Sequence, residues 1–174
     1  NGGEYRNRTN ALGDIVNSDP LYISREDKGY RALPGAEGSS YSAFIGITRR
    51  PMIYIGANDG MLHGFDAGLT SEGGKEIFAF VPNAAISAEM TTLTNPNYTH
   101  KYLVDGSPQA GDVYYDGAWH TVLVGSMGAG STTAVSGPTG MASGTGGRSV
   151  FALDITDPDQ FDANKVLWEY SSRE

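Results

Sequence analysis

Short apolar segments separated by turn-forming residues dominate the pattern of the chain. The stretch 51–67, PMIYIGANDGMLHGFDA, places two such segments on either side of Asn58, Asp59 and Gly60. These residue types tolerate the positive φ values of tight hairpin turns, so the stretch predicts a β-hairpin. Segments of β-branched and aromatic residues on both sides of it predict further strands. The four strands predicted in this part of the chain cover residues 18–24, 51–57, 61–67 and 75–82.

The same order of segments returns after an interval of about 90 residues. Asp154 ends the third strand of the second set, where Asp66 ends the third strand of the first. We expect each carboxylate to accept backbone N–H groups and to fix the next turn, which is a structural role. The strands predicted for the second set cover residues 105–117, 120–126, 149–155 and 165–170.

A repeated unit of four antiparallel strands is typical of a β-propeller. We therefore predict an all-β partial propeller over residues 1–174, with blades at about 18–82 and 105–170 and a connection at 83–104. The connection contains one short helix, predicted within AAISAEMTTL. Two blades cannot close a ring, and a stack left open has bare apolar faces and unpaired edges. Further blades are therefore expected as partners.

Two long loops accompany the blades. Residues 25–50 contain clusters of Gly, Pro and Ser and predict a surface excursion. Residues 125–148 are rich in glycine, but no Gly-Lys-Ser/Thr and no G-x-G-x-x-G occur, so a phosphate-binding loop is not supported. We interpret this stretch as a flexible loop that is available to a partner.

Composition and charge exclude several classes of function and structure. The formal net charge is −8 and the 12 basic residues are dispersed, whereas a nucleic-acid binder needs a basic stripe. No apolar run approaches the roughly 18 residues that span a bilayer. The chain has no cysteine, which excludes disulfides and thiolate sites. It begins at Asn1 without methionine or signal peptide, as expected of an excised or processed segment.

The candidate chemistry is sparse. No serine hydrolase elbow and no paired-histidine zinc motif occur, so no catalytic or cofactor-binding residue is assigned. Four aspartates cluster in DITDPDQFD, and clustered oxygen ligands would suit calcium. The spacing lacks the glycine and closing glutamate of an EF-hand loop, so a solvated Asp-Pro turn is preferred and no metal is assigned. The metal candidates considered are Asp154, Asp157, Asp159 and Asp162.

The motifs, taken in order, resemble a known family. GANDGMLHGFDA (56–67), VDGSP (104–108) and VFALDITDP (150–158) look like the C-terminal propeller of the PilY1/PilC family of type IV pilus tip proteins. The resemblance covers most of the chain. It implies a modified seven-bladed propeller. The insertion at 131–146 departs from the family, in which GAG runs almost directly into GRSVFALD.

The resemblance also implies a function. We expect a non-catalytic adhesin and pilus assembly factor, exported to the cell surface and placed at the pilus tip. Its expected partners are minor pilins, the remaining blades, and a host-cell or abiotic surface, and its expected outputs are pilus biogenesis, twitching motility and adhesion. The family's calcium site lies in an Asp-rich loop that no stretch of this sequence matches, so no cofactor is assigned to this segment.

Two alternatives share the strand pattern. One is a fragment of a pyrroloquinoline-quinone-type propeller dehydrogenase, whose blades have similar glycine and tryptophan positions. Such an enzyme needs a catalytic aspartate, a central calcium site and quinone-contacting groups, and none of them can be placed in this sequence. The other alternative is a generic extracellular interaction propeller.

Overall fold

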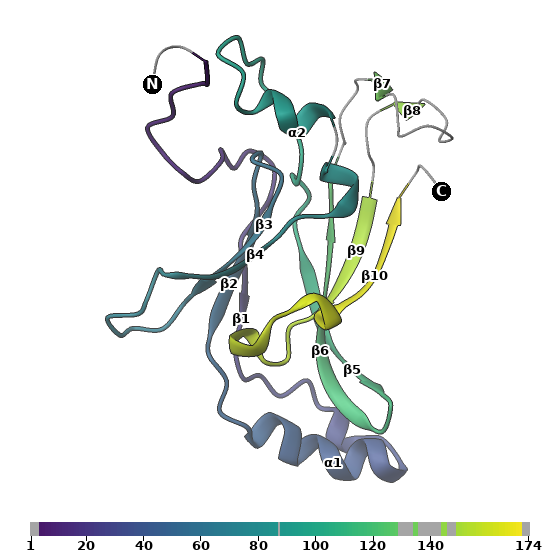
Figure 1. Cartoon of the computed structure of the whole chain (residues 1–174). Coiled ribbons are helices and arrows are strands. Elements are labelled where there is room, and N and C mark those ends of the chain that lie inside the picture. The colour runs from purple at the N-terminus through teal and green to yellow at the C-terminus, as the bar shows by residue number, and fades with distance from the viewer. Residues whose placement is uncertain (1–3, 87, 129–133, 136–143, 146–148, 172–174) are drawn as a thin grey trace.

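Two four-stranded antiparallel sheets make up the computed structural model, which describes residues 4–86, 88–128, 134–135, 144–145 and 149–171 (Figure 1). Each sheet is a meander, in which every strand pairs with the next strand of its unit. The first sheet contains β1 (Leu21–Ile23), β2 (Met52–Gly56), β3 (Leu62–Asp66) and β4 (Glu76–Phe80). The second contains β5 (Gln109–Tyr115), β6 (Ala118–Ser126), β9 (Ser149–Asp154) and β10 (Val166–Ser171). A separate two-stranded ribbon is formed by β7 (Ala134–Val135) and β8 (Gly144–Thr145).

The strands of the two sheets are paired in equivalent registers. Met52 pairs with Asp66 in the first sheet, and Val122 pairs with Asp154 at the same place in the second. In each sheet the pairing of the last two strands also shifts by one residue at the equivalent position. The shift arises because the fourth strand has a β-bulge there. The equivalent positions are therefore Tyr54 and Val124, Leu62 and Val150, Phe78 and Trp168, and Phe80 and Tyr170.

The main core lies between the two sheets. It is a single cluster of buried side chains to which both sheets contribute, together with Val104 from the connection. At the outer strand of the first sheet, Phe78 stacks on Phe161 of the second unit, with ring centroids 3.8 Å apart. The second sheet thus covers one face of the first. The sheet residues of the buried cluster are Met52, Tyr54, Leu62, Leu123, Phe151 and Leu153.

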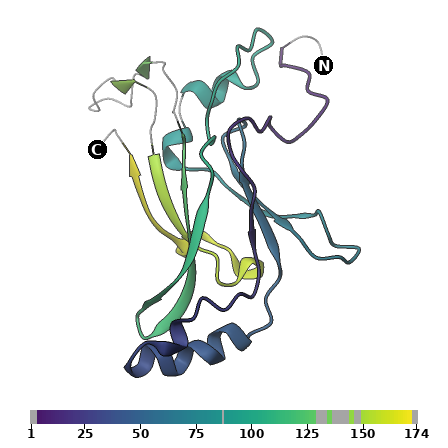
Figure 2. The same ribbon diagram turned by 180° about the vertical axis from the view of Figure 1, so that it is seen from behind.

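The chain segments that precede β1 and β5, the first strand of each sheet, are also in contact. Hydrogen bonds join three pairs of residues that lie 88 positions apart: Asn17 with Asp105, Ser18 with Gly106, and Asp19 with Ser107. Figure 2 shows the chain that enters β1 running beside the chain that enters β5. Equivalent positions of successive units are therefore in direct contact.

Residues 25–50 differ from the predicted surface excursion, because their centre forms the helix α1 (Gly35–Gly46), preceded by the 3-10 turn η1 (Tyr30–Ala32). The helix lies against the β5–β6 hairpin (Figure 1). Its Tyr41 and Phe44 pack on Trp119, and the Trp119 indole N–H donates to the carbonyl of Glu37 at 2.9 Å. The apolar contacts of the helix come from Tyr41, Phe44 and Ile45, since the rest of GAEGSSYSAFIG is small or polar.

The connection contains the short helix that was expected, but in two pieces. A 3-10 turn, η2 (Asn83–Ala85), precedes α2 (Ala88–Thr92). Two further 3-10 turns, η3 (Pro158–Gln160) and η4 (Ala163–Lys165), precede β10. Among the described residues, no helix is both long enough and apolar enough to cross a membrane. Apart from β7 and β8, the predicted insertion at 131–146 lies outside the described residues.

Candidate functional site

The hairpin turn at Asn58, Asp59 and Gly60 is buried at the top of the first sheet. Only Gly60 has a positive φ, of 93°, whereas Asn58 and Asp59 do not. The N–H of Gly60 donates to the carbonyl of Ala57 at 3.2 Å, and the N–H of Ala57 donates to the carbonyl of Met61 at 3.0 Å. This is a three-residue hairpin loop closed by a left-handed glycine, rather than a turn with two left-handed residues.

The side chains of this turn hold two distant segments. Asn58 Oδ1 accepts the N–H of Leu103 at 3.0 Å, and Asn58 Nδ2 donates to Asp14 Oδ2 at 3.0 Å. Asp59 Oδ2 accepts the N–H of Gly13 at 2.6 Å. The turn therefore anchors both the N-terminal segment and the connection between the sheets. These long-range contacts carry no signal in the sequence.

A buried histidine lies under the turn. His63 Nε2 is 3.1 Å from Asp59 Oδ1, and His63 Nδ1 is 2.5 Å from Glu76 Oε1. Burial alone would lower the pKa of His63, but its contacts with the two carboxylates outweigh burial and raise that pKa. Burial likewise opposes the charged form of Asp59, yet His63 and the N–H of Gly13 hold the pKa of Asp59 below its ordinary value. Asp59, His63 and Glu76 thus form a hydrogen-bonded triad next to the turn.

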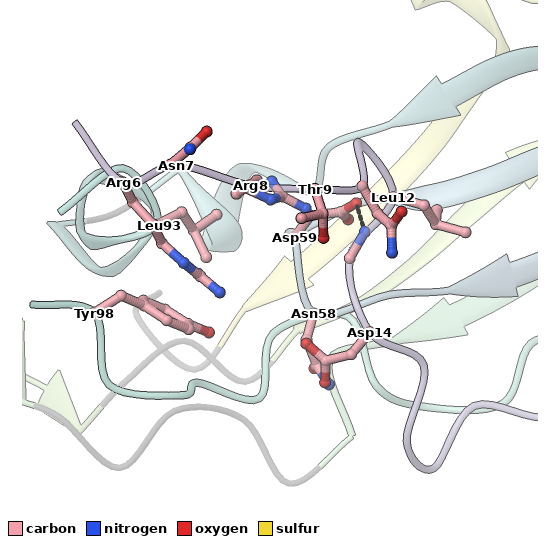
Figure 3. Close-up of a pocket in the computed structure, with 12 residues that line it drawn as sticks. Arg6, Asn7, Arg8, Thr9, Leu12, Asp14, Asn58, Asp59, Leu93 and Tyr98 are labelled. Atoms are coloured by element: carbon pink, nitrogen blue, oxygen red, sulfur yellow. Dashed lines mark hydrogen bonds between the residues drawn. The ribbon is translucent and has the colours of Figure 1, made fainter. Parts of the chain in front are cut away.

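The N-terminal segment and the turn enclose a polar cavity of about 340 Å³ (Figure 3). The Arg6 guanidinium lies over the ring of Tyr98, 4.0 Å from its centroid, and Leu93 lines the cavity beside them. Asp14 and Asp59 form the opposite wall (Figure 3). The lining mixes guanidinium and carboxylate groups with few apolar atoms, so its charge does not select one class of ligand.

Asp66 and Asp154 end the third strands of the two sheets. Asp66 Oδ1 accepts the N–H of Gly68 at 2.5 Å, and Asp154 Oδ1 accepts the N–H of Thr156 at 3.0 Å. The N–H of Gly68, followed by Arg50, lowers the pKa of Asp66. Burial works against the charged form of Asp154, but Thr156, His120 and Lys165 together outweigh burial and lower the pKa of Asp154. Both carboxylates organise the turn that follows their strand.

A basic residue pairs with each of these aspartates from the same place in the register. Arg50 hydrogen-bonds Asp66 in the first sheet, and His120 Nδ1 lies 3.0 Å from Asp154 Oδ2 in the second. Arg50 also donates through Nε to Asp159 Oδ1 of the second unit at 2.8 Å. Arg50 therefore ties the end of one sheet to the other sheet.

The four clustered aspartates do not converge on a point. Asp154 faces Thr156 and His120, whereas Asp159 pairs with Arg50. Asp157 and Asp162 cap η3 and η4 by accepting backbone N–H groups. Within the described part of the chain, no group of three or more His, Cys, Asp or Glu residues is placed to hold a metal ion.

One face of the second sheet is open. Val150 and Trp168 are 40% and 49% exposed, whereas Leu62, the equivalent of Val150, is fully buried. The equivalent face of the first sheet is the one that the second sheet covers. Single exposed apolar residues are common, but a row of them across three neighbouring strands marks an interaction surface. This open face consists of Val124, Val150, Trp168 and Tyr170.

Comparisons with known proteins agree with this architecture. The family model of the PilY1 beta-propeller domain matches residues 12–137. The crystal structure of the Pseudomonas aeruginosa PilY1 C-terminal domain is 36% identical with a TM-score of 0.55, and the match covers 86% of this chain and 24% of that one. The predicted partial β-propeller is therefore confirmed, and the two sheets are blades.

Curated relatives are similar over almost the whole chain. A "Type IV pilus biogenesis factor PilY1 homolog" of Xylella fastidiosa is 41% identical over 99% of this chain, and "Type IV pilus biogenesis factor PilY1" of P. aeruginosa strain PAO1 is 41% identical over 97%. The chain spans only 11% and 13% of the length of these two relatives. By its family model and these identities, the chain belongs to the PilY1 beta-propeller domain family.

Proposed function

We propose that the chain is a non-catalytic part of the propeller of a type IV pilus biogenesis factor. The observation that carries the proposal is the match to the PilY1 beta-propeller family, together with relatives that are named for pilus biogenesis. The function of the longer protein is then to support pilus assembly, twitching motility and adhesion to host cells or abiotic surfaces. Its place is extracellular, at the pilus tip.

Two classes of partner follow from this proposal. The remaining blades of the propeller cover the open face of Val124, Val150, Trp168 and Tyr170, which is apolar and exposed. Minor pilins and the tip complex bind elsewhere, on the loops and on the outer surface. No cofactor belongs to this segment, and any calcium site of the longer protein lies in another loop.

A chimera tests the biogenesis role. The corresponding segment of P. aeruginosa PilY1 is replaced by this chain in a strain without its own PilY1, and surface pili, twitching zones and attachment are measured. We expect all three to be restored. A chimera that accumulates and is exported normally but yields no surface pili would contradict the proposal.

A matched pair of variants tests the open face in the same chimera. Trp168→Glu places a charge on the face and should reduce the amount of folded protein and of pili. Leu69→Glu, on a fully exposed apolar side chain in the turn between β3 and β4, is the control and should reduce neither. Redox activity with added quinone and calcium should be absent from the purified chimera, and activity above a buffer blank would favour a dehydrogenase.

A further inference from the structure

Two buried hydrogen-bond donors between the blades have no partner. Among the buried side-chain nitrogen and oxygen atoms of the described residues, these are Arg49 Nε and Tyr54 Oη. Both residues line the same small cavity. Buried polar groups are almost always hydrogen-bonded, so two unpaired atoms at one cavity indicate that a ligand binds between them.

Both atoms carry a proton that they can donate. The Tyr54 side chain is fully buried. Burial raises the pKa of Tyr54, and the nearby Arg49 charge only partly offsets this, so the hydroxyl keeps its proton. Guanidinium nitrogens donate and never accept. The Tyr54 hydroxyl can also accept, so only Arg49 Nε requires an acceptor, and an acceptor with two lone pairs would pair both atoms.

The rest of the Arg49 side chain is held in place. Its Nη1 donates to Thr121 Oγ1 of β6 at 2.7 Å, and its guanidinium lies 4.6 Å from the centroid of the Phe44 ring. Thr121 in turn donates to Asp112 Oδ1 at 2.9 Å. Among the described residues, no carboxylate lies within 4.0 Å of the Arg49 nitrogens. Arg49 therefore forms no direct ion pair there, and its charge favours a negatively charged acceptor in the cavity.

The size of the cavity limits the ligand to one heavy atom. The space open to the centre of a water-sized sphere is about 10 Å³, which is close to the minimum that holds one water molecule. The walls come from both units: Ile23 and Met52 from the first sheet, and Ile155, Thr156 and Pro158 from the second. An organic ligand or a polyatomic anion does not fit.

We propose that this cavity is a binding site for a single-atom hydrogen-bond acceptor, a water molecule or a halide ion, held by Arg49 Nε–H and Tyr54 Oη–H. The bound acceptor joins β2 and its lead-in to the segment that follows β9, and so becomes part of the contact between blades. Water and halide share the same two donors. They differ in charge and in scattering, which allows an experiment to distinguish them.

Crystals of the wild-type chain grown in sodium bromide test the site directly. A density peak within hydrogen-bond distance of both donor atoms supports the proposal. An anomalous signal at the peak identifies a halide, and a peak without that signal identifies water. The proposal is overturned if well-ordered density shows no peak, or if the two side chains turn to other partners.

The variant Tyr54→Phe supplies a test in solution whose sign depends on the ligand. If a bound acceptor pairs the hydroxyl, removing the hydroxyl should shift the unfolding equilibrium toward the unfolded state by about twofold to tenfold. If the hydroxyl is unpaired, its removal should stabilise the chain, which would overturn the proposal. Tyr22→Phe, whose side chain is 53% exposed, is the matched control and should leave the equilibrium unchanged.

Discussion

Trp168 occupies in β10 the position that Phe78 occupies in β4, yet the two rings have opposite surroundings. Phe78 is stacked on Phe161 of the neighbouring blade, with centroids 3.8 Å apart, whereas the Trp168 side chain is 49% exposed. The same place in the register is thus a half-buried contact between blades in one blade and an exposed position in the other.

This difference predicts unequal costs for the same kind of substitution. Phe78→Ala removes a stacked ring from the contact between blades and should destabilise the chain by about 2–4 kcal/mol. Trp168→Ala removes a ring that contacts little in this chain and should cost less than about 1 kcal/mol. Urea unfolding followed by circular dichroism measures both. Equal losses would show that the open face is covered in the isolated chain.

The triad of Asp59, His63 and Glu76 predicts a pH-dependent stability. The pKa of His63 is raised in the folded chain, so its contribution is complete below the ordinary histidine value and is lost as the pH rises through the raised value. The urea midpoint of the wild-type chain should therefore fall on the alkaline side of about pH 6.5. His63→Gln should flatten this part of the profile. Glu76→Gln should flatten it only partly, because Asp59 still pairs with the ring. A slope unchanged in both variants would contradict a contribution of the triad to stability.

The hydrogen bond between Asp59 and Gly13 predicts that Asp59 stabilises the position of the N-terminal segment. Asp59→Ala removes the acceptor of the Gly13 N–H and one partner of His63. Hydrogen exchange at the Gly13 amide should accelerate at least about tenfold, because the amide loses its protecting hydrogen bond. Trypsin cleavage after Arg8 should accelerate in parallel. Asp116→Asn, on an exposed hairpin turn whose positive φ suits asparagine, is the control and should leave both rates unchanged.

The two contacts of Arg50 predict that the blades stabilise each other. Arg50→Gln breaks contacts with Asp66 in one blade and with Asp159 in the other. Its urea midpoint should fall below that of Lys75→Gln, which breaks a surface pair with Glu72 inside a single hairpin. In a double-mutant cycle, Arg50→Gln and Asp159→Asn should be non-additive. Additive losses would mean that the contact between blades is not formed in solution.

The strands were largely predictable, because their signal is local. The strands β2 and β6 coincide with the β-branched and aromatic segments at residues 52–56 and 118–126. The alternating burial along them is set by the packing of the sheets. The helix α1 was not predictable. Its stabilising partner Trp119 is remote in sequence, and its own residues show no continuous apolar stripe.

The site was predictable only where its contacts join residues that are close together in the sequence. Asp66 and Asp154 bind the N–H two residues ahead, which a strand-end carboxylate suggests. The partners of Asn58 and Asp59 are far along the chain, and only the fold brings them together. Sequence spacing offered one further signal, since Asp59 and His63 are four residues apart across a hairpin turn. The position of Glu76 depends on the pairing of β3 with β4.

The hydrogen bonds between residues 88 positions apart have a geometric consequence. A rotation that carries one blade onto the next moves each atom in proportion to its distance from the axis. Residues that meet their own counterparts after this rotation must lie close to that axis. Asn17, Ser18 and Asp19, with Asp105, Gly106 and Ser107, therefore line the hub of the propeller. Insertions at the rim can lengthen without disturbing the angle between blades, whereas a single residue inserted at the hub would change that angle.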